Sequence, residues 1–176
     1  RFQAVKTWGL FDKNGTEINS LVKPGKTTII DLSAYTNLSG SSNIKALVIS
    51  IISKKLLVDR INKRKIEELE AIETTENYFS IEEKKEKREM PLVWIFLDEA
   101  HEFIPKEGKT PATDALVQLL REGRQPGISL VLATQQPGEI HRDVLTQTDI
   151  VISHRVTAKR DVAALNAMSQ SYLIAD

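Results

Sequence analysis

The sequence predicts an α/β fold in which helices flank a mostly parallel sheet. Short apolar segments alternate with longer segments of helical periodicity, in the order β-α-β-α-β-(α)-β-α. The connections between them are short, as is usual in parallel βαβ units. Residues 92–97 are apolar throughout, which is typical of a strand buried on both faces of such a sheet.

The composition limits the kind of protein. A chain of 176 residues suffices for one domain with a substantial core. Basic and acidic side chains balance at 24 each, so no overall basic field indicates a nucleic-acid partner. The absence of cysteine excludes disulfides and thiolate metal sites and suits a cytoplasmic protein. No apolar stretch reaches the roughly 18 residues of a membrane span.

The first predicted strand is residues 27–32, which are β-branched and apolar. The Gly-Lys-Thr sequence at 25–27 resembles the end of a phosphate-binding loop. However, Ser20 stands where that motif requires glycine, and a strand is expected to follow instead of a helix. We therefore expect no phosphate loop here. Apolar residues then recur at helical spacing, which predicts a long helix from about Asn43 to about Leu69.

The region 54–90 is rich in charge. We expect it to contain the charged end of the long helix and a mobile connector over 73–89. The basic side chains of the helix could contact DNA phosphates, but a solvated face paired with glutamates four residues away explains them better. These side chains are Lys54, Lys55, Arg60, Lys63, Arg64 and Lys65.

The second half of the chain continues the alternation of strands and helices. Thr110-Pro111 is a good helix start, and Gly123 is a good helix stop. The predicted elements are strands at 92–97, 128–133 and 149–153 and helices at 110–121, 139–146 and 159–168.

Polar side chains follow the predicted strand ends. Asp98 and Glu99 come directly after residues 92–97, and Gln135 and Arg155 follow the next two strands. We expect all four on one edge, where ligands of open α/β sheets bind. An apolar strand followed by Asp-Glu is the Walker B pattern of nucleoside triphosphatases. In it the first acid holds Mg²⁺ through water, and the second polarises the attacking water. The alternative is a buried strand that ends at a solvated turn.

Three side chains extend this prediction, and a fourth, Arg121, does not. Gln135 could orient the attacking water, with Arg155 contacting phosphate or fixing Gln135; the alternative for Gln135 is a turn residue before Pro137. Arg121 lies at a helix carboxyl end, where the helix dipole favours cations. Arg124 follows the helix stop, in a surface turn. A guanidinium there is suited to reach the nucleotide of a neighbouring subunit, as an arginine finger does.

A resemblance to a known family is carried by three segments, FLDEAHEFIP, LLREGRQPGISLVLATQQP and DIVISHRVTAKRD. They resemble the HerA–FtsK class of ring-forming P-loop ATPases, in particular the archaeal and bacterial HerA-type DNA translocases. The resemblance is dense over 91–164 and thinner over 27–57. It implies that residues 1–176 are the C-terminal part of a RecA-like ATPase domain. It further implies ATP and Mg²⁺ in the complete protein, a hexameric ring, double-stranded DNA as substrate and a nuclease partner.

The resemblance also implies roles for single residues. Asp98 matches the family's Mg²⁺-linked acid and Glu99 its catalytic glutamate. Arg124 matches the arginine finger that acts in trans. Gln135 matches the glutamine at the end of its strand, and Arg155 the arginine of the following strand.

Three features depart from the family or leave a role open. Gln136 stands where the family usually has arginine, so the role of that position is open. His101 matches the histidine of the family's DEAH motif, and a hydrogen-bonding residue at a helix start explains it equally well. The sequence has no Walker A loop. We therefore expect the C-terminal part of a larger ATPase that binds ATP weakly or not at all by itself.

Other functions fit parts of the same pattern. A DEAH-box helicase would place a Ser-Ala-Thr element after DEAH, which Ala133-Thr134 imitates, but its last arginine motif would follow that strand instead of preceding it. A secretion or conjugation pump ATPase shares the core layout. A non-catalytic assembly module without Walker A is the alternative outside the enzymes, and a GxxxxGK[ST] motif upstream would decide against it.

Overall fold

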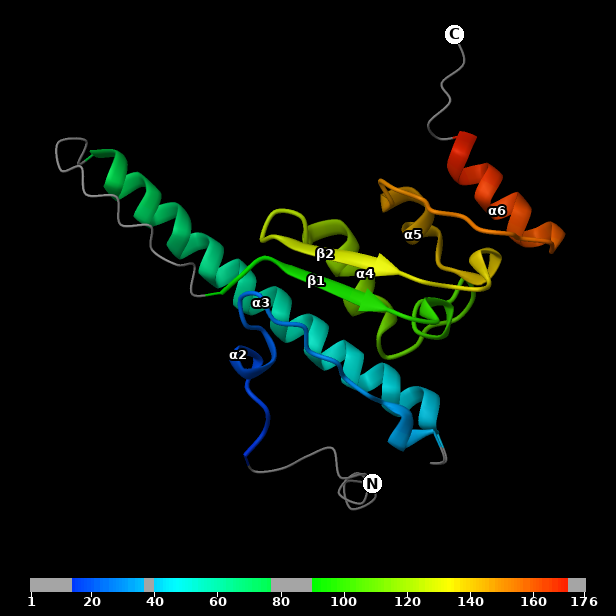
Figure 1. Ribbon diagram of the computed structural model, residues 1–176, viewed down its shortest axis with the longest axis horizontal. Helices are drawn as coiled ribbons and strands as arrows, with labels where there is room; N and C mark the ends of the chain where they lie inside the picture. Colours follow the sequence, from blue (N-terminus) through cyan, green and yellow to red (C-terminus); the bar gives the residue numbers. More distant parts are fainter. Residues whose placement is uncertain (1–13, 37–39, 77–89, 171–176) are drawn as a thin grey trace, which may run out of the picture.

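The computed structural model describes residues 14–36, 40–76 and 90–170 (Figure 1). The elements are α2 (Ile18–Leu21), η1 (Ser33–Tyr35), α3 (Ser41–Glu76), β1 (Val93–Leu97), η2 (Ala100–Glu102), α4 (Thr113–Glu122), β2 (Ile128–Leu132), η3 (Pro137–Glu139), α5 (Arg142–Gln147) and α6 (Lys159–Gln170). Within these residues no helix is both long enough and apolar enough to cross a membrane.

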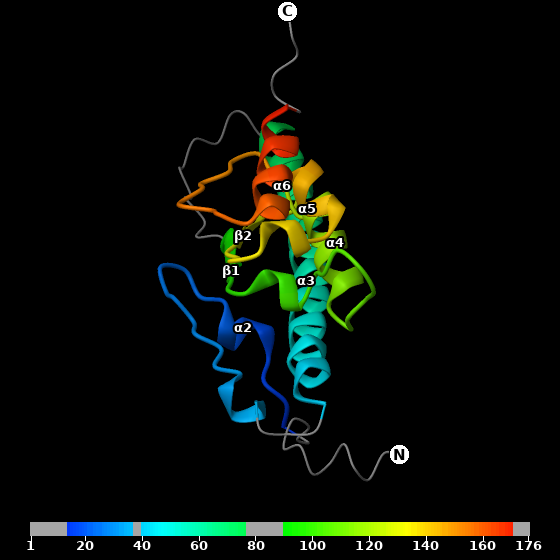
Figure 2. The same cartoon turned by 90° about the vertical axis from the view of Figure 1, so that its right-hand side faces the viewer.

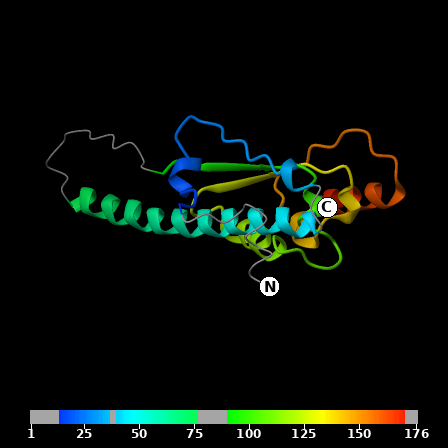
Figure 3. The same cartoon turned by 90° about the horizontal axis from the view of Figure 1, so that it is seen from below.

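The sheet is formed by β1 and β2, which run parallel. Val93 pairs with Ile128 and Leu97 with Leu132, so the two strands are aligned over their full length. The connection between them contains α4. Figures 2 and 3 show α3 and α4 on the same face of the sheet. The predicted α/β class with parallel strands is confirmed for this part of the chain.

The hydrophobic core lies between the sheet and these two helices. Ala115, Leu116 and Leu119 recur at helical spacing on α4, and all three are buried. Leu56 and Leu57 of α3 join Leu116 and Leu119 in one apolar cluster. Each fully buried leucine contributes about 1.5–3 kcal/mol relative to an exposed one. The core therefore fixes the helices against one face of β1 and β2.

The other face of β1 is open, and the prediction of a strand buried on both faces is wrong. Val93, Ile95 and Leu97 are half-buried, whereas Trp94 and Phe96 are 65% and 72% exposed. The Trp94 and Phe96 rings stack with their centroids 6.4 Å apart. Side chains alternate between the two faces of a strand, and among the described residues only one face is covered. The result is an exposed apolar stripe.

Two of the four predicted strands are absent from the described residues. Residues 27–32 and 149–153 have no regular secondary structure, and Ile29, Ile150 and Ile152 are 86%, 77% and 95% exposed. A β-branched composition favours extended backbone, but a strand also needs a hydrogen-bonded neighbour and a surface to pack on. Neither segment has such a neighbour here, so the sheet of the described residues has two strands.

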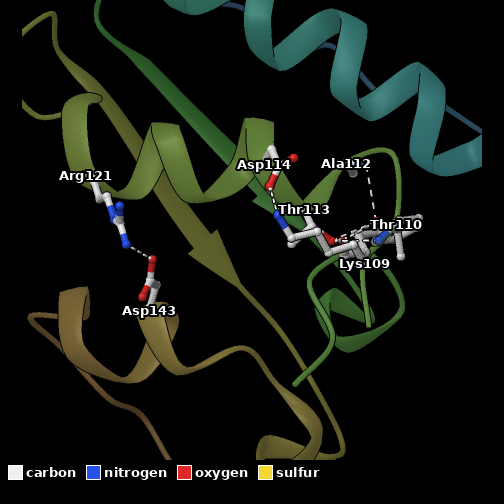
Figure 4. Close-up of polar contacts among 8 residues, drawn as sticks. Lys109, Thr110, Ala112, Thr113, Asp114, Arg121 and Asp143 are labelled. Carbon is white, nitrogen blue, oxygen red and sulfur yellow. Dashed lines mark hydrogen bonds and ion pairs between the residues drawn. The ribbon is translucent and has the colours of Figure 1, made fainter. Parts of the chain in front are cut away.

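The helices differ from their predicted bounds mainly at the ends. α3 continues to Glu76, so it includes the start of the predicted connector; the rest of that connector, 77–89, lies outside the described residues. α4 begins at Thr113, because the Thr110 side chain instead closes a turn (Figure 4). Its hydroxyl donates to the Phe103 carbonyl and accepts the Ala112 N–H. The predicted helix at 139–146 is divided into η3 and α5, whereas α6 confirms the predicted last helix.

The first turn of α4 also carries an ion pair. Lys109 Nζ lies 2.9 Å from Asp114 Oδ1, as Figure 4 shows. The hydrogen bond from Lys109 holds the pKa of the Asp114 carboxyl below its usual value. A carboxylate in the first turn also interacts favourably with the amino end of the helix dipole. The pair therefore helps to begin the helix after the Thr110 turn.

Arg60 of α3 is buried, although the sequence placed it on a solvated face. Its Nε donates to the Pro126 carbonyl at 2.7 Å and its Nη1 to the Met90 carbonyl at 2.8 Å. Nη1 also lies 3.2 Å from Glu67 Oε1. Helical spacing could not reveal this, because the partners come from the turn before β2 and the segment before β1. Arg60 therefore ties the middle of α3 to both strands.

The turn before β2 fits tightly against the sheet. Gly127 has φ +84°, and a Cβ atom there would lie 2.3 Å from Leu92 Cδ2. The backbone conformation therefore disfavours a side chain at this position, and Leu92 would have to move to make room for one. Residues 124–127, which we call the arginine turn, are held by this glycine and by the Arg60 bond to Pro126.

We predict that Arg60→Met lowers the free energy of unfolding by about 3–5 kcal/mol. The substitution leaves the Pro126 and Met90 carbonyls without their donor and removes one of the two arginines that pair with Glu67. Urea unfolding followed by circular dichroism measures the change. Arg64→Met is the matched control, because Arg64 is 42% exposed and its ion pairs with Glu67 and Glu68 lie at the surface. Surface pairs contribute about 0–1 kcal/mol, so equal losses in the two variants would contradict the prediction.

Candidate active site

The carboxyl ends of β1 and β2 form one edge, and the polar residues that follow the strands meet there. The pairing continues past both strands, because Ala133 N donates to the Leu97 carbonyl and Ala100 N to the Ala133 carbonyl, each at 2.9 Å. This places Glu99 beside Gln135. Gln135 Nε2 donates to Glu99 Oε1 at 2.9 Å. The prediction that these two residues share an edge is confirmed.

The backbone at Glu99 has an unusual conformation. Its φ of +47° and ψ of +46° are left-handed, and among the described residues Glu99 is the one non-glycine residue with positive φ. This conformation costs about 1–2 kcal/mol in a residue with a side chain. The Asp98 carboxylate accepts the Glu99 N–H at 2.9 Å and stabilises the bend. Strained backbone of this kind is common where a side chain must be aimed at a ligand.

One carboxylate oxygen of Glu99 has no hydrogen-bond partner among the described residues. Glu99 Oε2 is buried and accepts no hydrogen bond from the described residues. The closest charged group is His101, whose Nδ1 lies 3.5 Å away. A buried carboxylate oxygen without a donor is costly, and the nearby His101 ring nitrogen is the group placed to offset part of that cost. Its neighbour Oε1 is already held by Gln135.

A second set of contacts surrounds His101. Its Nδ1 lies 3.0 Å from Thr134 Oγ1, and its Nε2 lies 3.5 Å from the amide nitrogen Nε2 of Gln136. An amide nitrogen donates, so this contact fits the tautomer in which His101 Nε2 accepts. Gln136 in turn accepts from Arg160 Nη2 of α6 at 3.4 Å. The sequence did not predict Thr134 as a site residue. Its position next to Gln135 was the one signal that could have indicated this role.

Arg155 does not reach this edge. It lies exposed in the irregular segment that precedes α6, because residues 149–153 do not form a strand beside β2. No hydrogen bond or ion pair joins it to Gln135 or Glu99 within the described part of the chain. The expected alignment of Arg155 with the acids therefore fails together with the strand on which it depended.

Arg124 lies at the opposite end of the sheet. The arginine turn precedes β2, whereas Glu99 follows β1, and the two five-residue strands are parallel (Figure 1). Five residues of strand span about 16 Å. Arg124 is exposed and forms no side-chain hydrogen bond or ion pair with the described residues. Arg121, by contrast, is held within the chain by Asp143 of α5 at 2.6 Å (Figure 4).

The donors at the carboxyl edge fit a magnesium ion carried by a nucleotide. Within the described residues no three histidine, aspartate or glutamate side chains group together as a metal site. Magnesium in nucleotide sites needs only one or two carboxylates, because water and phosphate supply its other ligands. Asp98 is exposed at the edge, and the half-buried Glu99 follows it directly in the chain. The residues present are therefore compatible with that ion.

Comparison with known proteins gives consistent matches. The sequence model of the helicase HerA-like C-terminal family matches residues 75–176. The DNA double-strand break repair helicase HerA of Pyrococcus furiosus is 27% identical over 148 residues, which cover 80% of this chain and 26% of that protein. The probable DNA double-strand break repair helicase HerA of Methanocaldococcus jannaschii is 30% identical over 156 residues, or 83% of this chain and 29% of that protein.

A secretion protein matches as well. The ESX secretion system protein EccC of Geobacillus thermodenitrificans is 27% identical over 164 residues, covering 87% of this chain and 11% of that protein. The chain thus spans about a quarter of the length of the two helicases and about a tenth of the secretion protein.

Proposed function

This chain belongs to the helicase HerA-like C-terminal family, and on that basis we propose that it is part of a ring-forming, ATP-hydrolysing DNA translocase. Residues 1–176 would form the C-terminal part of its RecA-like ATPase domain. The observation that carries the proposal is the 2.9 Å hydrogen bond from Gln135 to Glu99 at the carboxyl edge of two parallel strands. ATPases of this type place their water-activating carboxylate at such an edge.

Each polar residue of the edge has a part in the proposed reaction. Bound Mg²⁺ and ATP would supply the phosphoryl group and neutralise its charge. Asp98 would hold the ion through water. The Glu99 carboxylate would accept a hydrogen bond from the attacking water, while Gln135 holds Oε1 and so fixes the plane of the carboxylate. His101 Nδ1 lies 3.5 Å from Oε2 and 3.0 Å from Thr134 Oγ1, which helps to hold the ring in place.

The ring is supported by the position of Arg124. A residue at the amino end of β2 cannot contact a phosphate held at the carboxyl ends of the same sheet, about 16 Å away. An exposed guanidinium without an internal partner suits a neighbour's nucleotide instead. We propose that Arg124 acts in trans, in a hexamer. We give Arg155 no part, because the segment before it is not in the sheet.

The substrate is proposed from the relatives. Two of them are named as DNA double-strand break repair helicases, which supports double-stranded DNA as the substrate of the complete protein. The nuclease partner rests on the family resemblance alone. The match to a secretion system protein favours a second candidate, a pump ATPase that moves protein. Stimulation of ATP hydrolysis by duplex DNA separates the two, because a protein pump has no reason to respond to DNA.

We predict that Gln135→Ala in the complete protein lowers kcat about a hundredfold and changes the KM for ATP little. Without the Gln135 amide, Glu99 can rotate away from the attacking water, whereas ATP keeps its other contacts. Steady-state phosphate release measures both constants. Gln147→Ala is the matched control, since Gln147 is exposed at the end of α5. An unchanged kcat for Gln135→Ala would remove the main support for the proposed reaction.

A further inference from the structure

A hollow of about 780 Å³ lies between the second half of α3 and the arginine turn. We call it the basic hollow. Its charged lining comes from two separate parts of the chain. α3 contributes Arg64, Lys65 and Glu68, and the end of α4 with the arginine turn contributes Arg121, Glu122 and Arg124. The hollow is on the amino-end side of the sheet, away from Glu99.

Three of these six charged side chains, Arg64, Glu68 and Arg121, form ion pairs within the chain. Arg64 lies 3.1 Å from Glu68, Arg121 lies 2.6 Å from Asp143, and Glu122 accepts a hydrogen bond from Gln118. Of the cations, Lys65 and Arg124 remain without a side-chain partner among the described residues, and the Glu122 carboxylate, which is bonded to a neutral amide, lines the same hollow. Two unpaired cations in one hollow repel each other, and a bound anion would relieve that repulsion.

The two cations are held in a fixed relation to each other. Lys65 is on α3, and Arg60 of the same helix donates to the Pro126 carbonyl of the arginine turn at 2.7 Å. Arg60 is fully buried, so solvent does not compete for this bond. Gly127 fixes the other end of the turn. The backbone positions that carry Lys65 and Arg124 are therefore preorganised, which lowers the cost of binding one ligand with both.

We propose that Lys65 is a second phosphate-binding cation of the site in which Arg124 acts, and that the basic hollow takes the polyphosphate chain of a nucleotide. The inference rests on the proposed function for the identity of the nucleotide. Arg124 offers a planar donor pair that suits two oxygens of one phosphate, and Lys65 offers a point charge for a neighbouring phosphate. A chain of several phosphates can occupy both, whereas a single carboxylate cannot.

The test is a titration of this chain with inorganic tripolyphosphate, followed by the backbone amide NMR signals of the arginine turn. At low salt we expect a dissociation constant on the order of 1 mM. Lys65→Gln and Arg124→Gln should each weaken binding about tenfold. Lys55→Gln is the matched control, because Lys55 is an exposed lysine of α3 that does not line the hollow. It lies ten residues, about 15 Å, before Lys65 along the helix and should leave binding unchanged.

The outcomes separate this inference from its alternatives. Equal binding by wild type, Lys65→Gln and Arg124→Gln would overturn it. A parallel titration with duplex DNA would also overturn it if Lys65→Gln weakened DNA binding and not tripolyphosphate binding. The hollow would then contact the DNA backbone. Failure of the proposed function is detected elsewhere, by ATP hydrolysis that survives loss of Glu99 in the complete protein. That result would leave tripolyphosphate binding by this chain intact.

Discussion

Replacing Glu99 by glutamine should abolish ATP hydrolysis by the complete protein while leaving ATP binding intact. Glutamine keeps the size of the side chain, and its amide oxygen can still accept from Gln135. The amide cannot serve as a base for the attacking water, and general-base catalysis contributes about a hundredfold to ten-thousandfold. Single-turnover phosphate release and nucleotide binding by calorimetry measure the two properties separately.

The control for this variant is Glu102→Gln. Glu102 is an exposed glutamate of η2, three residues after Glu99; its backbone N–H donates to the Glu99 carbonyl, which the substitution keeps, and its side chain takes part in none of the contacts of the site. It should hydrolyse ATP at the wild-type rate. Turnover that survives in Glu99→Gln would show that another group activates the water, and Glu99 would then be only a structural residue of the turn.

Replacing Arg124 by alanine should lower kcat about a thousandfold to a hundred-thousandfold, the range observed for arginine fingers. Arg124 is exposed and without a partner, so its loss should leave the fold unchanged. The decisive experiment mixes variant and wild-type subunits at defined ratios. Each variant subunit should inactivate its wild-type neighbour, so hydrolysis should fall more steeply than the wild-type fraction.

Arg142→Ala is the control, because Arg142 is an exposed arginine at the start of α5, outside the basic hollow. Rings that contain it should hydrolyse ATP at the wild-type rate. If hydrolysis in the Arg124→Ala mixtures follows the wild-type fraction linearly, Arg124 does not act on a neighbouring subunit.

The sequence correctly predicted those elements whose apolar faces are buried by a neighbouring layer. α3, α4 and α6 show helical spacing that one adjoining layer can bury, and β1 and β2 pair through the short connection that contains α4. Residues 27–32 and 149–153 have the same β-branched character, but a strand depends on its neighbours, and none is present beside them. A β-branched composition indicates a preference for extended backbone, but it does not indicate which strand will pair with the segment.

The same distinction applies to single residues of the site. Glu99 and Gln135 could be predicted to meet, because parallel strands bring their carboxyl ends to one edge. The link from His101 to Gln136 and Arg160 depends on the path of two loops and on a left-handed bend, which no spacing indicates. Arg60 shows the opposite error: the charged composition of its segment predicted a solvated side chain, but it is buried and bonded to residues 30 and 66 positions away.

The open face of β1 has a consequence for how the chain behaves in solution. Leu92, Trp94 and Phe96 form an exposed apolar stripe on a two-stranded sheet, and Ile29 and Ile150 are exposed as well. Uncovered apolar stripes and free strand edges promote self-association. The balanced charge of the chain provides little colloidal repulsion against it. Solubility should therefore be lowest near neutral pH, close to the sequence pI of about 7.1, and should improve when Trp94 and Phe96 are replaced by polar residues.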